Sequence, residues 1–372
     1  MSIIFLVGGC LCVGYIILIY NIYSNWGNYS PNVQKLDTIP NISIVIAARN
    51  EASCISACLE SIYKNEYPFP NFEVIVVDDH STDQTSQIAR SIDHQNISVT
   101  VLSSPGQGKK AAVDYGISMA KFPNILCTDA DSIVSNQWLI SHATSFNTTG
   151  IAMSCGVVLP TKGERFIENF QWLDFVATMA ITSYGINKKQ FYLANGANIG
   201  FTKVGFYGVN GFSGNAHLAS GDDVFLAQKF AESNPNSIRF LQSKDAIVYT
   251  KPAPNWSAFF NQRKRWASKS SHSSNQKVVA IQSFVFIFST FICTSFLVGI
   301  WVQPLMWIGI IAMCTKLFTD YIFLLKLSKS LENPYAMKFF VPSFFFYFIH
   351  IFLSGWHALF PSSYQWKDRN VS

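Results

Sequence analysis

The sequence predicts an α/β domain, built on a mostly parallel β-sheet covered by helices and joined to several membrane-spanning helices. Two observations indicate this fold class. In the first half of the chain, apolar β-branched segments alternate with amphipathic helical segments, an order that is typical of parallel sheets. Four apolar runs with few or no charges also lie near the two ends of the chain, and each has the roughly 20 residues needed to cross a bilayer.

The composition is that of a membrane protein. Of the 372 residues, 49% are hydrophobic and only 13% are charged, which is too apolar for an ordinary soluble enzyme. The net charge is +5, and the clustered cations lie beside the apolar runs. We expect no nucleic-acid partner, because nucleic-acid binding requires a basic face, whereas the predicted cleft is rimmed by acidic residues.

Transmembrane helices are predicted at residues 1–23, 278–302, 305–325 and 339–360. The first run could also be a signal peptide. It has no basic segment before its apolar part and no small-residue cleavage site after it, so we expect a retained anchor. Together the runs predict an integral membrane protein, which we expect in a bacterial cell (inner) membrane.

The orientation of the chain follows from its cations. Lys and Arg cluster at 263–269 and at 326–338, and cationic loops tend to stay in the cytosol. We expect a cytosolic domain at residues 37–254, followed by an amphipathic segment at 255–276 at the membrane surface. Three C-terminal spans would place the tail outside, but the basic segment at 366–369 disfavours that side. The side of the tail therefore stays open.

Four buried strands are predicted in the first half of the domain, at residues 42–48, 72–79, 97–102 and 124–131. Each is an apolar run rich in β-branched residues, and helical patterns follow the first three. In parallel sheets, ligands bind beyond the carboxyl ends of the strands. Because acidic or amide residues follow three of these strands, we expect a binding site at that edge of the sheet.

Two acidic motifs at strand ends suggest ligand chemistry. In TDAD, the carboxylates Asp129 and Asp131 are separated by one residue, a pattern that can hold Mg²⁺ or Mn²⁺ together with substrate phosphates. The alternative is a solvated turn that caps the next helix. In VVDDHSTD, capping explains the later residues but not the pair Asp78 and Asp79, one of which can bond a ribose hydroxyl or a base N–H.

Two further motifs open helices. PGQGKKAA is not a Walker A sequence, because its glycine spacing differs and a second Lys follows Lys109. At a helix N-terminus Lys109 can still meet phosphate, although a plain glycine turn is the alternative. In SGDDVFLAQKF, Asp222 and Asp223 start a helix, either as partners of the helix dipole or as the source of a general base.

The cationic motif NQRKRW precedes the apolar run that starts at Val278. A snorkelling membrane collar explains its lysines. It does not explain Gln262 and Trp266 at fixed spacing from Arg265. We expect these three near one helix face, where Arg suits bidentate phosphate binding. A diphosphate held between Arg265 and a metal on Asp131 would join the motifs into one site.

These motifs resemble those of membrane-bound family-2 glycosyltransferases. That family has the Rossmann-like GT-A fold of nucleotide-diphospho-sugar transferases, and it includes cellulose, chitin and hyaluronan synthases and many lipid glycosyltransferases. The resemblance covers about residues 40–270. Each matching element is weak alone, but their order and spacing are specific: AARNE (47–51), VVDDHSTD (76–83), GKKAAVDYGI (108–117), TDAD (128–131), GDD (221–223) and QRKRW (262–266).

The resemblance implies a role for each motif. A divalent metal, Mg²⁺ or Mn²⁺, would bind Asp131 and Asp129. ANGANIGF (194–201) would meet the acceptor or donor sugar. The donor nucleotide sugar, including its diphosphate, would contact Ala47, Arg49, Glu51, Asp79, Lys109, Asp129, Gln262, Arg265 and Trp266.

The general base departs from the family pattern. Asp223 matches the last acid of the family's Thr-Glu-Asp motif, which is the base, but Gly221-Asp222 replaces Thr-Glu, so Asp222 stays an alternative. Asp114 also stands where Asn is frequent. The three spans predicted after the domain are fewer than processive members usually carry.

By resemblance, the protein is an inverting hexosyltransferase. It would move a sugar from a nucleotide-diphosphate sugar, most often a UDP-sugar in this family, to a membrane lipid or lipid-linked acceptor at the cytosolic face. The alternative is a processive polysaccharide synthase with a glycan acceptor, which the QRKRW form favours. A degenerate domain acting as a scaffold is disfavoured by the intact acids. The sugar, nucleotide and linkage are not specified by the sequence.

Overall fold

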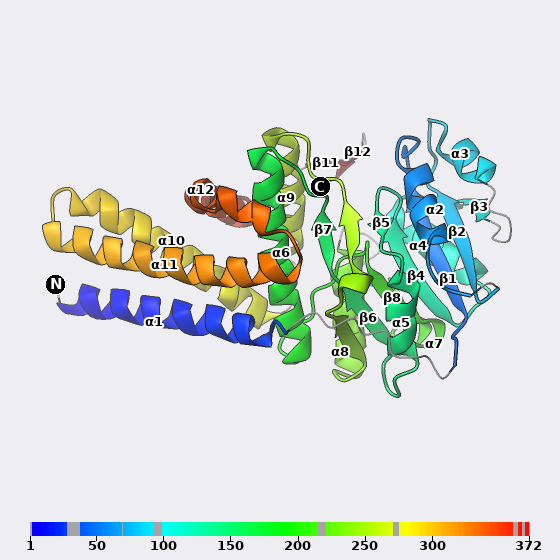
Figure 1. Ribbon diagram of the computed structural model, residues 1–372, viewed down its shortest axis with the longest axis horizontal. Helices are drawn as coiled ribbons and strands as arrows, with labels where there is room; N and C mark the ends of the chain where they lie inside the picture. The colour runs from blue at the N-terminus through cyan, green and yellow to red at the C-terminus, as the bar shows by residue number, and fades with distance from the viewer. Residues whose placement is uncertain are drawn as a thin grey trace.

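A computed structural model describes residues 2–27, 38–68, 70–92, 99–214, 221–270, 275–359, 364–366 and 369–371. The molecule is elongated (Figure 1). An α/β domain forms one end, and long apolar helices project from the other. The predicted α/β class is confirmed.

A seven-stranded sheet forms the centre of the domain, in the order β3-β2-β1-β4-β8-β6-β9. Its first four strands are parallel, whereas β8 is antiparallel to both of its neighbours. The four predicted strands are therefore present, and their described ends agree with the prediction to within two residues. Residues 97 and 98, where the third strand was predicted to begin, lie outside the described part of the chain. The strands are β1 (Ile42–Ala48), β2 (Phe72–Asp78), β3 (Val99–Ser103), β4 (Asn124–Asp129), β6 (Met153–Gly156), β8 (Ile199–Thr202) and β9 (Ile238–Leu241).

The domain helices cover this sheet. Their buried faces carry mainly apolar residues, which range in size from alanine to tryptophan. Helix α4 requires a glycine at position 116, because a Cβ there would lie 2.5 Å from the side chain of Val45 on β1. The helices are α2 (Ile55–Tyr63), α3 (Thr85–Ser91), α4 (Lys109–Met119), α5 (Trp138–Phe146), α7 (Lys203–Gly208) and α8 (Asp222–Ser233).

A second, three-stranded sheet lies between the large sheet and the projecting helices. It consists of β5 (Ile133–Val134), β10 (Val248–Thr250) and β7 (Val158–Pro160), and the short helix η1 (Lys244–Ala246) precedes β10. Beyond it stand α6 (Phe166–Asn187) and α9 (Trp256–Ser270), which form the side of the domain that faces the apolar helices (Figure 1).

Four helices in the described part of the chain are long and apolar enough to cross a membrane. Three of them, α1 (Ser2–Asn25), α10 (Gln276–Gly299) and α11 (Gln303–Ser330), run side by side (Figure 1). The fourth, α12 (Phe340–Leu359), follows the short helix η2 (Pro334–Phe339) and lies beside α6 and α9. A hairpin of β11 (Tyr364–Trp366) and β12 (Arg369–Val371) ends the chain.

Buried polar contacts join α1 to α11, although the two helices are far apart in the sequence. Lys316 is 1% exposed. Its Nζ donates to Oδ2 of Asp320 at 2.5 Å and to the hydroxyl of Tyr15 at 2.9 Å, and Tyr15 also donates to Oδ1 of Asp320. Near the domain, Trp26 Nε1 donates to Ser330 Oγ at 2.9 Å. These contacts fix how deep α1 lies along α11.

Candidate active site

The carboxyl ends of β1, β2 and β4 meet at one edge of the large sheet. Ala47 of β1 lies opposite Asp129 of β4, and Ala48 lies opposite Asp78 of β2. The residues that follow these strands must therefore share this edge, as the strand order predicts.

The loops after β1 and β2 are bonded to each other. Asn50 and His80 have left-handed backbones, with φ of 51° and 56°, a conformation that costs energy in residues other than glycine. The Asn50 side chain accepts from Thr82 N at 2.8 Å. Glu51 N donates to Thr85 Oγ1 at 2.7 Å. Through these bonds the Glu51 backbone is held at the sheet edge.

Asp79 and Arg49 stabilise this arrangement. Arg49 Nη1 donates to the carbonyl of Asp79 at 2.8 Å. Asp79 is only 2% exposed, and its Oδ1 accepts from Gly108 N at 2.9 Å. One oxygen of Asp79 therefore connects the end of β2 to the loop that contains Gly108. Its neighbour Asp78 has an Oδ1 that is shielded from solvent and accepts no hydrogen bond within the described residues.

Lys109 begins α4 directly after Gly108, whose φ of 94° needs glycine. Its Nζ pairs with Asp129 Oδ1 at 2.5 Å. Burial lowers the pKa of Lys109, but Asp129 and the acidic pair that opens α8 outweigh this effect and raise the pKa. Lys109 is therefore a permanent cation between two acidic groups.

Asp223 approaches the same cation from α8. Its Oδ2 accepts from Gly196 N at 2.9 Å and its Oδ1 from Val224 N at 2.9 Å. A Cβ on Gly196 would lie 3.2 Å from Lys109 Nζ and 3.7 Å from Asp223 Oδ2. The glycine in the predicted sugar-contacting loop therefore allows the ammonium and the carboxylate to come close together. Asp222, the first residue of α8, also interacts electrostatically with Lys109.

A buried network holds this loop from behind. Asn198 Nδ2 donates to the carbonyls of Val157 and Ala246, at 2.9 and 2.7 Å. Its Oδ1 accepts from Trp138 Nε1 at 2.9 Å and lies 2.9 Å from His142 Nε2. Because Oδ1 can only accept, His142 carries its proton on Nε2. Burial lowers the pKa of His142 to about 4, so the ring is neutral.

Lys251 is a residue that the sequence analysis missed. Tyr249 of β10 lies opposite Ile133 of β5 in an antiparallel pair, so two residues further on Lys251 comes opposite Asp131. Its Nζ lies 3.1 Å from Cys54 Sγ. This hydrogen bond raises the pKa of Lys251, and the nearby carboxylates of Asp131 and Glu51 raise it further. In the sequence Lys251 is a lone cation after a short strand, and nothing there marks its partner.

The acidic residues fit a metal site with few protein ligands. No group of three or more His, Cys, Asp or Glu side chains in the described residues could hold a metal ion. Asp129 and Asp131, which follow β4 in the sequence TDAD, could each supply a carboxylate oxygen. Mg²⁺ and Mn²⁺ accept such a set, because hard cations can bind one or two carboxylates and complete their shell with phosphate oxygens and water.

Helix α9 carries the cationic motif. Gln262, Arg265 and Trp266 stand at helical positions that lie within about 100° of one another. Trp266 packs on the domain, with its ring 5.3 Å from that of Phe175 on α6. Gln262 has a buried Oε1 without a hydrogen-bond partner among the described residues. Arg265 is half-buried.

A buried cation of α9 is Arg263, which the sequence analysis treated only as part of the collar. It is 7% exposed and pairs with Asp174 of α6. Its guanidinium lies 4.2 Å from the ring of Trp266 and 4.8 Å from that of Phe259. Arg265 is two residues along, roughly 200° around the helix. Arg263 therefore anchors α9 and turns Arg265 away from that contact.

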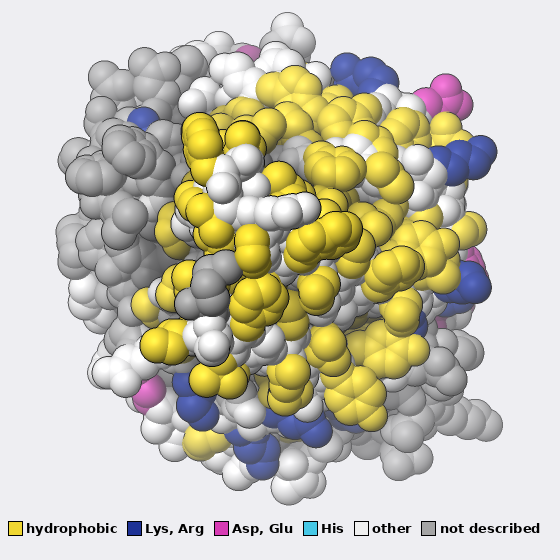
Figure 2. Space-filling model, turned by 90° about the vertical axis from the view of Figure 1, so that its left-hand side faces the viewer, with side chains coloured by type: hydrophobic (Ala, Val, Ile, Leu, Met, Phe, Trp, Pro, Cys, Tyr) yellow, Lys and Arg dark blue, Asp and Glu magenta, His cyan; other side chains and the backbone are white. Residues whose placement is uncertain are grey.

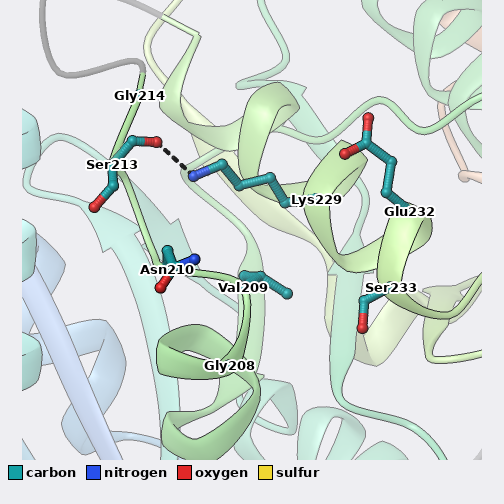
Figure 3. Close-up of a pocket in the computed structure, with 8 residues that line it drawn as sticks. All are labelled: Gly208, Val209, Asn210, Ser213, Gly214, Lys229, Glu232 and Ser233. Atoms are coloured by element: carbon teal, nitrogen blue, oxygen red, sulfur yellow. Dashed lines mark hydrogen bonds between the residues drawn. The ribbon is translucent and has the colours of Figure 1, made fainter.

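A surface pocket of about 430 Å³ lies apart from this site. It is lined by the turn after α7 and the second half of α8 (Figure 3), where Lys229 donates to the carbonyl of Ser213 at 2.6 Å. Asp222 and Asp223 are at the other end of α8. None of the predicted site residues lines this pocket.

Known proteins match the part of the chain that forms this sheet edge. Residues 43–210 match the family model described as Glycosyl transferase family 2. The chain carries a glycosyl transferase family 2 domain. This confirms the resemblance inferred from the motifs. The matched range contains β1, β2 and β4 with their acidic ends, and it stops before Asp222, Asp223 and α9.

Two curated relatives of this family 2 domain match shorter stretches. Glycosyltransferase AglE of Haloferax volcanii is 32% identical over 123 residues, which are 32% of this chain and 40% of AglE. The poly-beta-1,6-N-acetyl-D-glucosamine synthase of Staphylococcus aureus is 29% identical over 107 residues, 29% of this chain and 25% of the synthase. The chain thus matches less than half the length of each relative.

A solved structure resembles the whole chain, including the apolar helices. The mannosyltransferase PcManGT from Pyrobaculum calidifontis, solved in complex with GDP-Man and Mn²⁺, superposes with a TM-score of 0.57. The match covers 96% of this chain and 98% of PcManGT at 16% sequence identity. At that identity the likeness concerns the fold, and it confirms the predicted GT-A architecture.

Proposed function

We propose that this protein transfers a sugar from a nucleotide-diphosphate sugar to a lipid or lipid-linked acceptor at the cytosolic face of a membrane. The observation that carries the proposal is the convergence around Gly196 of Asp129 from β4, Lys109 from α4 and Asp223 from α8. These residues come from three separate elements, so they meet only because the chain folds. The family 2 domain supplies the reaction class.

Donor binding would use the edge formed by β1, β2 and β4. Asp131 and the second oxygen of Asp129 would hold Mg²⁺ or Mn²⁺, which would neutralise charge on the donor diphosphate. Lys251, opposite Asp131, would add a fixed positive charge beside it. Asp78 and Asp79 would face the nucleoside, and Asp78 has a carboxylate oxygen without a hydrogen bond in the described part of the chain.

Asp223 would be the general base. Two backbone N–H groups orient its carboxylate, and an ionised carboxylate can receive the acceptor hydroxyl's proton. The oxygen would then attack the anomeric carbon from the face opposite the leaving nucleoside diphosphate, and the configuration would invert. Removal of that proton in the transition state contributes about 10²–10⁴-fold in rate. Asp222 is the alternative base.

The proposed placement is a bacterial cell (inner) membrane with the domain in the cytosol. Apolar side chains cover the end of the molecule formed by α1, α10 and α11, with Lys and Arg at its edges (Figure 2). Cationic rims favour the cytosolic side. Arg265 and Gln262 on α9 would then lie between the domain and the lipid, near a lipid-linked acceptor.

The experiment is a donor-hydrolysis and transfer screen with the purified full chain. The panel contains UDP- and GDP-sugars with Mg²⁺ or Mn²⁺, since uridine is the common base in the family and PcManGT was solved with GDP-Man. A membrane-lipid extract supplies the acceptor. Release of nucleoside diphosphate with a single sugar on a lipid supports the proposal. No turnover with any donor would contradict it.

A second function, processive polysaccharide synthesis, is favoured by the relationship to the poly-beta-1,6-N-acetyl-D-glucosamine synthase. The same assay separates the two functions. A product that grows with time to many sugars per acceptor, at constant acceptor number, would select the synthase.

A further inference from the structure

Helix α12 is placed differently from the other three apolar helices. By length and hydropathy it could span a membrane. Yet its successive turns stay against the domain. The ring of Phe346 lies 4.3 Å from Trp256 of α9 and 5.1 Å from Phe170 of α6, and the ring of His350 lies 5.4 Å from Phe259.

The contacts made by the two ends of α12 lie at a similar depth in the bundle. Phe340, its first residue, has its ring 5.3 Å from Tyr321 of α11. Phe352, in its last described turns, lies 5.9 Å from Phe286 of α10. At 1.5 Å per residue, Tyr321 and Phe286 are about 14 and 15 Å from the domain-side ends of their helices. Because both ends of α12 are at similar depth, the helix runs crosswise to α10 and α11.

A spanning helix would make different contacts. Twenty residues of α-helix are about 30 Å long, so the last turns of such a helix would lie beside the far ends of α10 and α11. Instead, side chains at those far ends are exposed. Trp301 is 80% exposed, Trp307 58% and Val298 44%.

The two faces of α12 are chemically distinct. On the inner face, His350 Nε2 lies 3.9 Å from Oδ1 of Asp174, the buried partner of Arg263. The outer face is apolar and exposed. It is formed by an apolar stripe of side chains four residues apart, whose exposed fractions range from 38% to 57%: Val341, Phe345, Ile349 and Leu353.

We propose that α12 does not cross the membrane, but lies along the leaflet on the domain side with its apolar stripe against lipid acyl chains. The chain end would then be on the same side as the domain. Lipid is the occupant because hydrophobic side chains cover the end of the molecule formed by α1, α10 and α11 (Figure 2), and α12 packs on α10 and α11. The strand β11 also lies against α9, on the domain side. The inference requires membrane insertion but not glycosyl transfer.

The first test determines the side of the C-terminus. A short protease-cleavable tag is placed after Ser372 in the full chain, and right-side-out and inverted vesicles are treated with protease. Matched controls carry the same tag in the turn at 331–333, on the domain side, or at 300–302, on the far side. We expect the terminal tag to be cleaved together with the 331–333 tag. Cleavage together with the 300–302 tag would overturn the proposal.

The second test measures the depth of α12. A fluorescent dansyl amino acid replaces Phe345 or Leu353, which avoids the eight native cysteines, and lipids brominated near the head group or near the chain end quench it. We expect equal, shallow quenching at both positions. A spanning helix would separate them by about 12 Å, at 1.5 Å per residue. Ile311 and Ile322 on α11 are matched controls, about 16 Å apart along that helix.

The same measurement addresses another occupant of the apolar stripe. If a second copy of the chain covered it, neither brominated lipid would quench at Phe345 or Leu353, while Ile311 would still respond. That result would overturn the lipid contact. Both readouts are independent of turnover, so failure of the proposed glycosyl transfer would leave them unchanged.

Discussion

At the scale of single residues, the candidate site is defined by which partner each charge has. Lys109 pairs with Asp129, Asp223 is bonded to the backbone of Gly196, and Lys251 comes opposite Asp131. Lys109 is expected to contact phosphate. An ammonium has three N–H donors, so its pair with Asp129 is compatible with that contact.

Asp223→Asn should lower the rate of sugar transfer about 10²–10⁴-fold, because the amide cannot take the acceptor proton. Binding of the nucleotide should be unchanged, since the amide is nearly isosteric. Calorimetric titration of the nucleoside diphosphate, together with the transfer assay, checks both points. Asp222→Asn is the matched control. If it is inactive while Asp223→Asn is fully active, Asp222 is the base.

Lys251→Gln should weaken nucleoside diphosphate binding by roughly 10-fold, which corresponds to about 1.4 kcal/mol, because it removes a fixed positive charge beside Asp131. Lys251→Arg should restore much of the affinity. The difference should shrink as salt is raised, since the loss is electrostatic. Lys244→Gln is the control, because Lys244 pairs with Glu332 at the surface. Equal affinities for Lys251→Gln and the wild type would remove Lys251 from the site.

At the scale of elements, the site depends on buried polar side chains that position whole segments. Asn198 and His142 hold the loop that presents Gly196, and Arg263 with Asp174 fixes the rotation of α9. We assign neither pair a direct role in the reaction. Instead, the two pairs position the loop and the helix that carry the proposed site residues.

Stability should fall between about pH 6.5 and pH 4. His142 is neutral when folded, with its pKa lowered to about 4 by burial, whereas the unfolded chain takes up the proton near pH 6.5. Protons therefore favour unfolding across this window, by up to about 3 kcal/mol for 2.5 pKa units. Thermal unfolding in detergent checks this. His142→Asn should have a lower Tm at pH 7.5 but a smaller further decrease towards pH 4. A parallel decrease in both proteins would assign the pH effect to other groups.

Asp174→Asn should destabilise the chain by about 3–5 kcal/mol, because it leaves the buried Arg263 charge without its partner. The double variant Arg263→Met and Asp174→Asn should recover much of this loss, since no charge then remains buried. Thermal unfolding of the single and double variants measures the coupling. Additive losses in the double variant would show that the pair does not act as a unit.

At the scale of the whole molecule, α1 and α11 are joined by Tyr15, Lys316 and Asp320. Lys316→Leu should release α1, because Asp320 would lose its buried cation, and polar groups in a membrane bundle need partners. Protease accessibility of residues near Asn25 measures the release, which we expect to increase strongly. Lys316→Leu with Asp320→Leu should restore protection. Tyr15→Phe removes only hydrogen bonds, which average about 0.6 kcal/mol in membrane bundles, and should have a small effect.

Local sequence patterns predicted the order of strands and helices in the first half of the domain, the four apolar helices and the acidic edge. Each of these features produces a local pattern in the sequence. Buried parallel strands must be apolar, membrane helices must be long and uncharged, and polar residues at strand ends are brought to one edge by the parallel order. Asp79, Asp129, Asp131 and the Asp222-Asp223 pair could therefore be chosen without coordinates.

Contacts between side chains on distant segments became known only from the folded chain. Lys251 comes near Asp131 because β10 pairs with β5, and Arg263, rather than Arg265, is buried because α6 and α12 cover that side of α9. The direction of α12 was also open, since hydropathy measures length and composition but not the tilt of a helix. Contacts with α6, α9, α10 and α11 set that direction, and they join residues whose separation in the chain leaves no local signal.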